Sequence, residues 1–507
     1  MSELSVMGRT GTPGQQSSPG YCITLGSFVL SYYAQEHGAL NHRKNTNSHS
    51  NLRRHTVTAA DSWLIVVAGY AILLAWPVST VALVSFAVRY VAAHRGGAQG
   101  GQLPADGTPS HFWIIVPALN EQVVVGNTVN AALALSGPGG TLARVLVVDD
   151  GSDDATPEVL AAIDHPRLHV LRRNLPEARQ GKGEALNAAY RRIAAQMADE
   201  GVDPTKVVLG IIDGDGQGSP NILLEVSRML RDTRIGAVQV QVRIRNRDKL
   251  LGAVQDLEFG AIVNACQKLR DTIDTVGLGG NGQFTRLAAL LSLGDTPWSA
   301  CLVEDLELGL RMHLDGVGIR YTSRACVTQQ AVVDIRRLTR QRTRWAQGNL
   351  QCARYLRSLI GSRQFSRTAL AEVLHYLISP WINAIVTVAL IALVGTAVGG
   401  LLLGHPTSYL PSWEGLAASA GIWLAVTFFP GLVWALVHRQ RLGDEGLGRM
   451  IVAAIAYPAF LLLGLVATYR ALTRQITGRQ TWAKTERLAE EPLASLSALP
   501  GSLALAA

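Results

Sequence analysis

Four long apolar runs divide the chain. They lie near residues 62–92, 376–403, 415–437 and 450–469. As a helix, each run could cross about 30 Å of hydrocarbon, because a helix rises about 1.5 Å per residue. The pattern predicts a multi-pass membrane protein. We expect one transmembrane helix at residues 61–95 and a group of transmembrane or interfacial helices at residues 366–473.

The first apolar run contains a proline near its centre. Residues Trp63–Ala93 with Pro77 suit one tilted or kinked helix better than a hairpin of two. The preceding residues 1–60 are rich in Ser, Gly, Asn, His and Thr and have no sustained period. This composition predicts a disordered N-terminal extension.

The last apolar run brings two topology rules into conflict. If residues 111–360 lie in the cytosol, the two preceding spans return the chain to the cytosol, where His438, Arg439 and Arg441 fit the positive-inside rule. A full span at residues 450–469 would then place the arginines that follow it outside. We therefore expect that this run, broken at Pro458, is re-entrant or interfacial, or that a span upstream is miscounted. Residues 474–507 are then a basic and later low-complexity cytosolic tail.

Between the first two apolar runs, residues 111–360 alternate strand-like and helix-like patterns. Strands are predicted at Phe112–Val116, Arg144–Val148, Leu168–Leu171, Val207–Ile212 and Ala237–Ile244. Amphipathic helices between them imply a largely parallel sheet that is covered on both faces. In such sheets ligands bind beyond the carboxyl ends of the strands. The polar residues after each strand are therefore the candidates for a site.

Composition supports the membrane assignment. Of the 507 residues 48% are apolar, and the net charge is +8. Lys and Arg gather beside the apolar runs, which is typical of contact with anionic lipid headgroups rather than with nucleic acid. The five cysteines show no CxxC spacing, so neither a zinc site nor a disulfide framework is predicted.

Two aspartates end the most apolar strand. Asp213 and Asp215 are separated by Gly214, and on an extended chain they would point to the same face. Mg²⁺ takes one or two carboxylates together with substrate phosphates, so the pair is suited to a metal nucleotide. The alternative is a glycine-rich turn capped by Asp. We expect Asp215 to be a surface carboxylate that contributes little to the core.

Polar residues also follow the first two predicted strands. Asn120 and Glu121 come after the first, and Asp149 and Asp150 after the second. A carboxylate at a strand end can accept hydrogen bonds from a nucleobase edge or from ribose hydroxyls. The alternative is a turn before a helix, and Ser152 or Asp153 is expected to cap that helix.

A lysine opens the helix that follows. Lys182 lies in the Gly181–Asn187 segment, and a cation beside a helix N-terminus can meet a phosphate. The alternative is a flexible basic loop. The segment lacks the P-loop spacing.

Three further groups complete the candidates. The turn around Asn281 and Gln283 is glycine-rich. Glu304 and Asp305 open a helix, where acids are favoured by the helix dipole; Asp305 is the sharper candidate, since a carboxylate in a pocket could take a proton from an acceptor hydroxyl. The last group is Gln341, Arg344 and Trp345. It offers a guanidinium for diphosphate and an indole face for a sugar, although a solvated or membrane-facing helix is the alternative.

The ordered set Asp149-Asp150, Asp213-Gly-Asp215, Glu304-Asp305 and Gln341-Arg-Thr-Arg344-Trp345 resembles membrane-embedded family 2 glycosyltransferases. That group includes cellulose, chitin, hyaluronan and poly-N-acetylglucosamine synthases and is related to glucosyl-diacylglycerol synthases. The resemblance covers about residues 111–360. It implies an α/β GT-A (Rossmann-like) cytosolic domain joined to an α-helical transmembrane region, a UDP-sugar donor, Mg²⁺ or Mn²⁺, and inversion at the anomeric carbon.

Residue roles follow from the resemblance by position. Asp305 would be the catalytic base, and Asp213 and Asp215 would bind metal and nucleotide. The remaining nucleotide-sugar ligands would be Asn120, Glu121, Asp149, Asp150, Lys182 and Arg344. Acceptor contacts would come from Asn281, Gln283, Glu304, Gln341 and Trp345. The Gly280–Gln283 turn stands where cellulose synthases have a different small-residue turn near the acceptor.

Three functions remain open at this stage. The first is a processive synthase in the plasma membrane that moves a hexose or N-acetylhexosamine from a UDP-sugar to a growing β-linked glycan. The second is a single-transfer enzyme acting on a membrane lipid such as diacylglycerol. The third is a non-enzymatic membrane scaffold, which the intact acidic residues disfavour. The expected partners are the donor, a glycan or lipid acceptor, the bilayer and accessory membrane proteins, but no nucleic acid.

Overall fold

The structure is a computed structural model. It describes residues 74, 77–86, 88–89, 107–405, 412–479 and 487–491. The predicted disordered extension at 1–60 lies outside the described residues, as do most of the predicted first span and most of the predicted tail. Within that first span, Pro77–Phe86 is an apolar helix.

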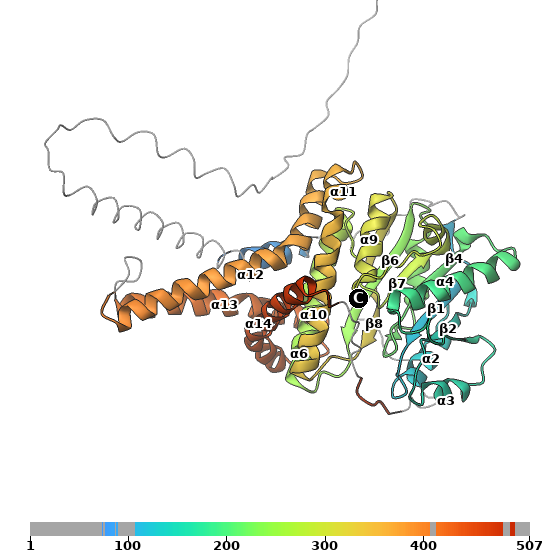
Figure 1. Cartoon of the computed structure of the whole chain (residues 1–507), viewed down its shortest axis with the longest axis horizontal. Helices are drawn as coiled ribbons and strands as arrows, with labels where there is room; N and C mark the ends of the chain where they lie inside the picture. The colour runs from blue at the N-terminus through green and yellow to red at the C-terminus, as the bar shows by residue number, and fades with distance from the viewer. Residues whose placement is uncertain are drawn as a thin grey trace, which may run out of the picture. The chain divides into compact units, whose positions relative to one another are not determined.

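An eight-stranded mixed sheet forms the centre of the catalytic part (Figure 1). Its strands are β1 His111–Ala118, β2 Arg144–Asp149, β3 Leu168–Arg172, β4 Val207–Ile211, β5 Gln217–Gly218, β6 Ile235–Ile244, β7 Gln283–Arg286 and β8 Gly318–Gln329. Their order is β3-β2-β1-β4-β7-β6-β8-β5. Neighbours from β3 to β4 are parallel, as are β6 and β8, whereas β7 is antiparallel to both its neighbours and β5 is antiparallel to β8.

All five predicted strands are present, and three further strands were not predicted. The four residues of β7 are buried but mostly polar, Gln-Phe-Thr-Arg, so the sequence there resembles a glycine-rich turn. The long strand β8 contains no apolar run. Both strands are specified by their neighbours in the sheet rather than by their own pattern.

The helices of the catalytic part cover both faces of the sheet. Their bounds are α2 Val125–Leu133, η2 Pro138–Gly140, α3 Thr156–Ala161, α4 Lys182–Asp199, η3 Pro204–Lys206, α5 Ile222–Met229, α6 Leu250–Leu257, η4 Glu258–Val263, α7 Asn264–Thr272, α8 Leu287–Leu291, α9 Glu304–Leu314, α10 Ile335–Cys352, η5 Ala353–Tyr355 and α11 Leu356–Gly361. Alternate residues of β1 enter different cores, as a strand requires. Ile114 packs with α2, α3 and α5, and Ile115 packs with α4, α8 and α9.

Three long helices follow the catalytic part. They are α12 Arg367–Leu402, α13 Trp413–Arg441 and α14 Leu447–Ile476, and each is long and apolar enough to cross a membrane. A mixed sheet whose strands are mostly parallel, followed by these helices, confirms the predicted fold class. Helix α14 also packs against catalytic helices, because Met450, Ala454 and Tyr457 share a core with α6 and α10.

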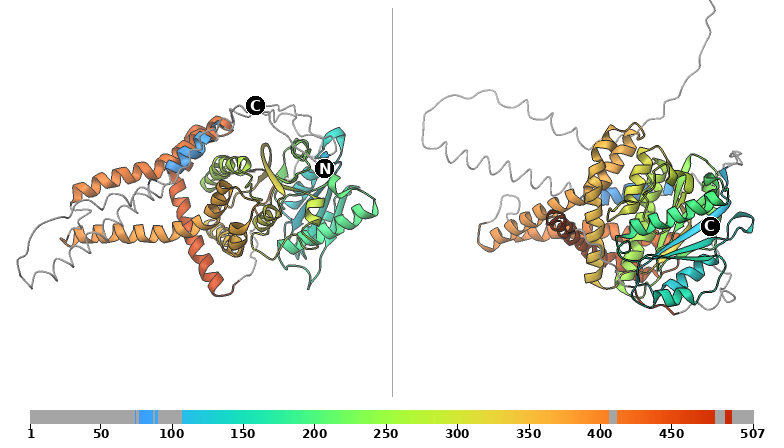
Figure 2. Two further views of the ribbon diagram at one scale, coloured as in Figure 1. Left: turned by 90° about the horizontal axis from the view of Figure 1, so that it is seen from above. Right: turned by 45° about the vertical axis from the view of Figure 1, so that its right-hand side comes forward.

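The predicted break at Pro458 is wrong, because α14 runs unbroken through this proline. Proline cannot donate a hydrogen bond to the carbonyl four residues earlier, which here belongs to Ala454. Gly431 of α13 packs directly on that carbonyl, so close that an added Cβ would lie 2.7 Å from the Ala454 oxygen. The carbonyl left without its helical donor therefore lies at the contact between α13 and α14. Figure 2 shows α14 running steeply across α12 and α13. That α14 is interfacial stays a prediction.

Gly431→Ala should destabilise the protein, because its new methyl group meets a backbone oxygen that cannot move without shifting α14. Overpacking of this kind costs about 1–3 kcal/mol. The measurement is the thermal midpoint of the detergent-solubilised full chain. Gly421→Ala is the control, since Gly421 lies on the same helix with nothing within 4 Å of its added Cβ. Equal midpoints for the two variants would contradict the packing role of Gly431.

Candidate active site

The topology brings the predicted site residues to one edge of the sheet. Strands β2, β1 and β4 are adjacent and parallel, so their carboxyl ends meet there. Asn120 and Glu121 follow β1, Asp149 and Asp150 lie at the end of β2, and the Asp213–Asp215 turn follows β4. This is the edge at which such sheets bind ligands.

Asp149 and Asp150 are buried and each is held by an arginine. Asp149 accepts a hydrogen bond from the backbone N–H of Ser152 at 2.9 Å and pairs with Arg172 at 2.8 Å. Asp150 pairs with Arg173 at 2.5 Å. Burial raises the pKa of Asp150 above its usual value, against the lowering effect of Arg173. Neither side chain is a freely exposed carboxylate.

The expected helix cap is wrong in detail. Ser152 Oγ accepts a hydrogen bond from the backbone N–H of Asn120 at 2.9 Å, and Asp153 accepts one from the Asn120 amide at 2.6 Å. Asp154 instead accepts from the N–H of Thr156, the first residue of α3, at 2.9 Å. Ser152 and Asp153 thus tie the second loop to Asn120, which has a positive φ of 55°.

The Asp213–Asp215 pair lies in a turn and not on a strand face. Strand β4 ends at Ile211, and the N–H of Gly216 donates to the carbonyl of Asp213 at 2.6 Å. The expectation that Asp215 is a surface carboxylate is wrong, since its exposure is 0%. Its Oδ2 accepts from the N–H of Gln330 at 2.9 Å. Its Oδ1 lies 3.0 Å from Arg487 Nη2, and burial raises its pKa.

Lys182 connects the turn to the start of α9. Its ammonium lies 2.6 Å from Asp213 Oδ1 and 3.7 Å from Glu304 Oε1. Burial alone would raise the pKa of Asp213, but the Lys182 charge and hydrogen bond lower it below its usual value. Burial lowers the pKa of Lys182, and the surrounding carboxylates raise it by more. Lys182 therefore stays charged and pairs with Asp213 and Glu304.

Two acids at the start of α9 share this environment. Burial raises the pKa of Glu304 to about 7, although Lys182 opposes the shift. Burial also raises the pKa of Asp305, whose Oδ1 accepts from the N–H of Leu306 at 2.7 Å. Gly280 has a φ of 71°, and an added Cβ there would lie 2.8 Å from Asp305 Oδ2. Only glycine leaves room for the carboxylate at this position.

Of the two candidates in the glycine-rich turn, Asn281 contacts the Asp213–Asp215 turn and Gln283 is buried in the sheet. Asn281 Oδ1 accepts from the N–H of Asp213 at 3.2 Å, and its amide donates to Gln329 at 2.8 Å. Gln283 is completely buried in β7 between β4 and β6. The acceptor contact of Gln283 stays a prediction.

Helix α10 places its basic residues beside the acidic cluster. Gln341, Arg344 and Trp345 share one helix face, because their spacing is close to a helical turn. The Arg344 charge lowers the pKa of Asp213, Glu304 and Asp305, although burial is the largest influence on each. Arg342 lies 4.5 Å from the centre of the Trp345 ring.

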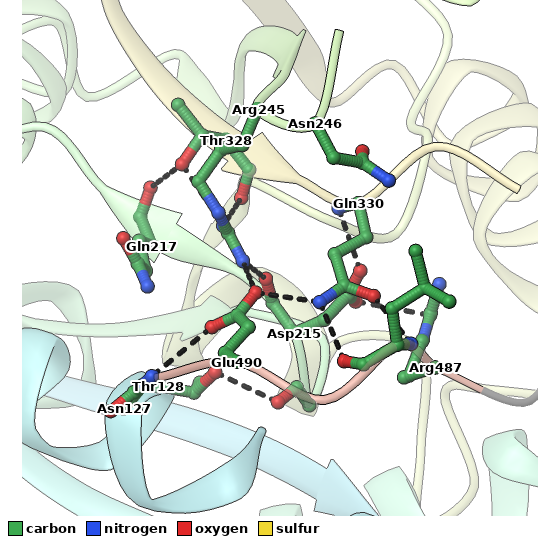
Figure 3. A network of polar contacts seen from close by, with 12 residues as sticks. Asn127, Thr128, Asp215, Gln217, Arg245, Asn246, Thr328, Gln330, Arg487 and Glu490 are labelled. Atoms are coloured by element: carbon green, nitrogen blue, oxygen red, sulfur yellow. Dashed lines mark hydrogen bonds and ion pairs between the residues drawn. The ribbon is translucent and has the colours of Figure 1, made fainter. Parts of the chain in front are cut away.

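Sequence reasoning missed the residues that cover Asp215. Arg487 pairs with it, and Glu490 from the same segment contacts Arg245 and Gln330 (Figure 3). These residues lie in the part of the chain predicted to be a plain tail. The one available signal was a short group of charged residues, Arg487, Glu490 and Glu491, before an uncharged stretch.

Residues 109–348 match the family model described as "Glycosyltransferase like family 2". This part of the chain is a glycosyltransferase family 2 domain, and with the mixed sheet it confirms the predicted GT-A class. The match includes every candidate site residue and ends within α10.

Curated relatives are similar over the same part. A β-monoglucosyldiacylglycerol synthase of Trichormus variabilis is 32% identical over 247 residues, which are 48% of this chain and 49% of the relative. A poly-β-1,6-N-acetyl-D-glucosamine synthase of Staphylococcus epidermidis is 29% identical over 245 residues, 46% and 53% of the two chains. The chain thus spans about half the length of the curated relatives it matches.

A solved mannosyltransferase of Pyrobaculum calidifontis in complex with GDP-Man and Mn²⁺ aligns with a TM-score of 0.49 and 19% identity. The alignment covers 76% of this chain and 98% of that one.

Lys182→Gln should destabilise the protein, and more so as the pH rises. Breaking a buried ion pair costs about 3–5 kcal/mol. The pKa of Asp213 is lower in the folded state than in the unfolded state. Ionised Asp213 therefore stabilises the fold at any pH above its unfolded pKa, and this stabilisation requires the charge of Lys182. The pKa of Glu304 is raised from 4.5 to about 7, so its ionisation lowers the free energy of unfolding as the pH rises through this range. Without Lys182 this loss is larger.

The measurement is the thermal midpoint of wild type and variant between pH 5 and 8. Lys249→Gln is the control, because Lys249 is exposed at the start of α6. If Lys182→Gln lowers the thermal midpoint by the same amount at every pH in this range, Lys182 does not compensate the charge of the acidic cluster.

Proposed function

We propose that this chain is an inverting membrane glycosyltransferase that transfers a hexose or N-acetylhexosamine from a UDP-sugar to a growing β-linked polysaccharide. The observation that carries the proposal is the cluster of buried Glu304 with half-buried Asp213, Lys182 and Asp305 at the carboxyl edge of a family 2 domain. It supplies a cation beside a candidate base. Multi-pass insertion in the plasma membrane, with this domain in the cytosol, is part of the proposal and is supported by the three long apolar helices.

Asp213 and Asp215 would hold Mg²⁺ or Mn²⁺. The fit rests on Asp215 Oδ1, a buried oxygen that accepts no hydrogen bond from any described residue and faces a cationic group. Among the described residues, no three His, Cys, Asp or Glu side chains are arranged so that they could hold a metal ion together, so the remaining ligands would be diphosphate and water, as Mg²⁺ prefers. When bound, the cation would neutralise charge on the departing UDP.

Asp305 is proposed to accept the proton of the acceptor hydroxyl. Its raised pKa brings it closer to the operating pH, which favours a general base. Lys182 and Arg344 would add positive field at the diphosphate. The acceptor oxygen then forms the bond to the anomeric carbon as the bond to UDP breaks on the opposite face, so one displacement gives one inversion.

The other residues would bind the two substrates. Asn120, Glu121, Asp149 and Asp150 lie at the ends of β1 and β2, where a nucleoside could be recognised. Asn281, Gln283, Glu304, Gln341 and Trp345 would contact the acceptor.

A second acceptor is favoured by one specific observation. The relative that is 32% identical is a synthase of a glucosyl-diacylglycerol, whereas the polysaccharide synthase is 29% identical. Transfer of a single sugar to a membrane lipid such as diacylglycerol is therefore the second candidate function. Both functions use the same donor site and the same base.

Asp305→Asn should retain donor binding and lose turnover by about 10²-fold to 10⁴-fold, because it removes the proton acceptor and little else. The measurements are UDP binding and sugar transfer by the full chain in membranes. Glu304→Gln is the matched control on the same helix turn. Near-normal transfer by Asp305→Asn, or an equal loss in both variants, would falsify the base assignment.

Analysis of the labelled product distinguishes the two acceptors. Membranes that contain the protein are supplied with labelled UDP-glucose or UDP-N-acetylglucosamine, and Asp305→Asn membranes are the blank. The main proposal predicts a product that stays in the aqueous phase and is cleaved by an endo-glycosidase. A labelled product that partitions into organic solvent would favour the lipid acceptor instead.

A further inference from the structure

Two cysteines lie side by side where the start of α9 meets α10. Cys301 belongs to the loop before α9, and Cys352 is the last residue of α10. Both are free thiols in one buried apolar cluster. The Cys301 sulfur lies 3.8 Å from the Gly348 carbonyl. Because a helical side chain covers the turn that precedes its own Cα, Cys352 lies over the same turn. The two sulfurs are therefore neighbours, and the Cys352 thiol donates a hydrogen bond to Cys301.

The loop before α9 packs tightly on α10 at this point. The N–H of Leu302 donates to the side-chain oxygen of Gln351 at 3.0 Å. An added Cβ at Gly348 would lie 2.8 Å from the backbone nitrogen of Val303, so the two backbones are as close as glycine allows. Asp305, the proposed base, lies in the first turn of α9 directly after this loop. A shift of the loop on α10 is therefore carried to Asp305.

The other side of the thiol pair leads to a second residue of the site. Arg344, Gly348 and Cys352 are spaced four residues apart on α10, so they lie in one row along the helix. The charge of Arg344 lowers the pKa of Asp305, although burial is the larger influence. The two cysteines thus lie at the contact between the element that carries the proposed base and the element that carries the proposed diphosphate ligand.

Cys301 is the more reactive of the two thiols. The hydrogen bond from Cys352 lowers the pKa of Cys301, against the opposing effect of burial, and the backbone N–H of Val303 lowers it further. The same contact raises the pKa of Cys352. The thiolate is the nucleophilic form of cysteine. Cys301 is 9% exposed and Cys352 is 0% exposed, so a small oxidant reaches Cys301 first.

We propose that Cys301 and Cys352 are a redox site, at which a peroxide forms a reversible disulfide that ties the start of α9 to α10 and slows sugar transfer. This modification site goes beyond the proposed function, and only its effect on transfer rests on that function. In the cytosolic location proposed above, the thiols are reduced at rest, and disulfides that form there are transient.

The oxidation proceeds in two balanced steps. The Cys301 thiolate attacks one oxygen of the peroxide, the O–O bond breaks, and hydroxide leaves as water after taking a proton, which gives a sulfenic acid on Cys301. The Cys352 sulfur then attacks the Cys301 sulfur. The S–O bond breaks as the S–S bond forms, and the oxygen leaves as water with the proton of Cys352. Two thiols have lost two electrons, and hydrogen peroxide has become two waters.

The disulfide should displace the proposed base. A covalent bond holds two sulfur atoms closer together than contact between thiols does, so the loop and α10 must move relative to each other. The contact at Gly348 leaves no space between the two backbones. The loop must therefore shift along α10, and Asp305 shifts with it. A displacement of about 1 Å from the reacting geometry can lower a rate by about 10²-fold.

Disulfide mapping on the full chain tests the site directly. The reduced protein in detergent is treated with hydrogen peroxide, alkylated and digested without reductant, and linked peptides are identified by mass spectrometry. We expect a peptide that joins Cys301 to Cys352. Cys266 and Cys326 should stay free, because burial raises the pKa of both thiols. Transfer from labelled UDP-glucose or UDP-N-acetylglucosamine should fall on the order of 10²-fold and return with dithiothreitol.

Single substitutions separate the roles of the two thiols. Cys301→Ala should form no disulfide, and its transfer should resist peroxide. Cys352→Ala should stop at the sulfenic acid, which dimedone traps on Cys301. Cys326→Ala is the matched control, because Cys326 is a half-buried free thiol on β8. This variant should form the disulfide and lose transfer as the wild type does.

The outcomes separate the redox site from the proposed function. If peroxide-treated wild type yields no peptide that joins Cys301 to Cys352, the redox site is overturned, and this result needs no variant to fold. A linked peptide with unchanged transfer, or a loss of transfer that persists in Cys301→Ala, overturns the effect on catalysis. A protein that transfers neither sugar before oxidation contradicts the proposed function, whereas the linked peptide would still establish the disulfide.

Discussion

The structure depends on cationic side chains that balance the negative charge of several carboxylates at one edge of the sheet. Asp213, Asp215, Glu304 and Asp305 are brought together by β4 and α9, and ionised carboxylates in such a place need cations close by. Three cationic side chains supply that charge from distant parts of the chain: Lys182 of α4, Arg344 of α10 and Arg487. A divalent cation held by these carboxylates would add positive charge to the cluster, and the negative diphosphate would offset it.

The apolar helices take part in holding this arrangement. Helix α10 carries Arg344 on one face, and its buried Gln347 accepts a hydrogen bond from Arg474 of α14 at 2.9 Å. His438 of α13 lies 2.8 Å from Asp256 of α6, and both side chains are fully buried. Trp434 and Met450 share a core with α6 and α10. Helix α10, which carries Arg344, is therefore packed against α14 and joined to it by a hydrogen bond.

Most of the fold and part of the site could be predicted from the sequence. Apolar periodicity located β1, β2, β3, β4 and β6 and the long helices, because burial of apolar side chains dominates those elements. It missed β7 and β8, whose polar residues are buried through pairing with neighbouring strands. Local spacing located the acids, yet it misjudged Asp215, since the group that buries it lies 272 residues further along the chain. A contact so distant leaves no periodic signal.

Pro458 and Gln283 show the same limit. The proline lies inside an unbroken α14, and Gly431, on another helix, packs against the Ala454 carbonyl that lacks its donor. Gln283 lies beside a glycine turn, but pairing of β7 with its neighbouring strand leaves this residue buried.

The most direct test of the central claim is an experimental structure of the full chain with Mn²⁺ and UDP. The account predicts Mn²⁺ on Asp213 and Asp215 beside the diphosphate, whereas Mn²⁺ bound away from both carboxylates would contradict it.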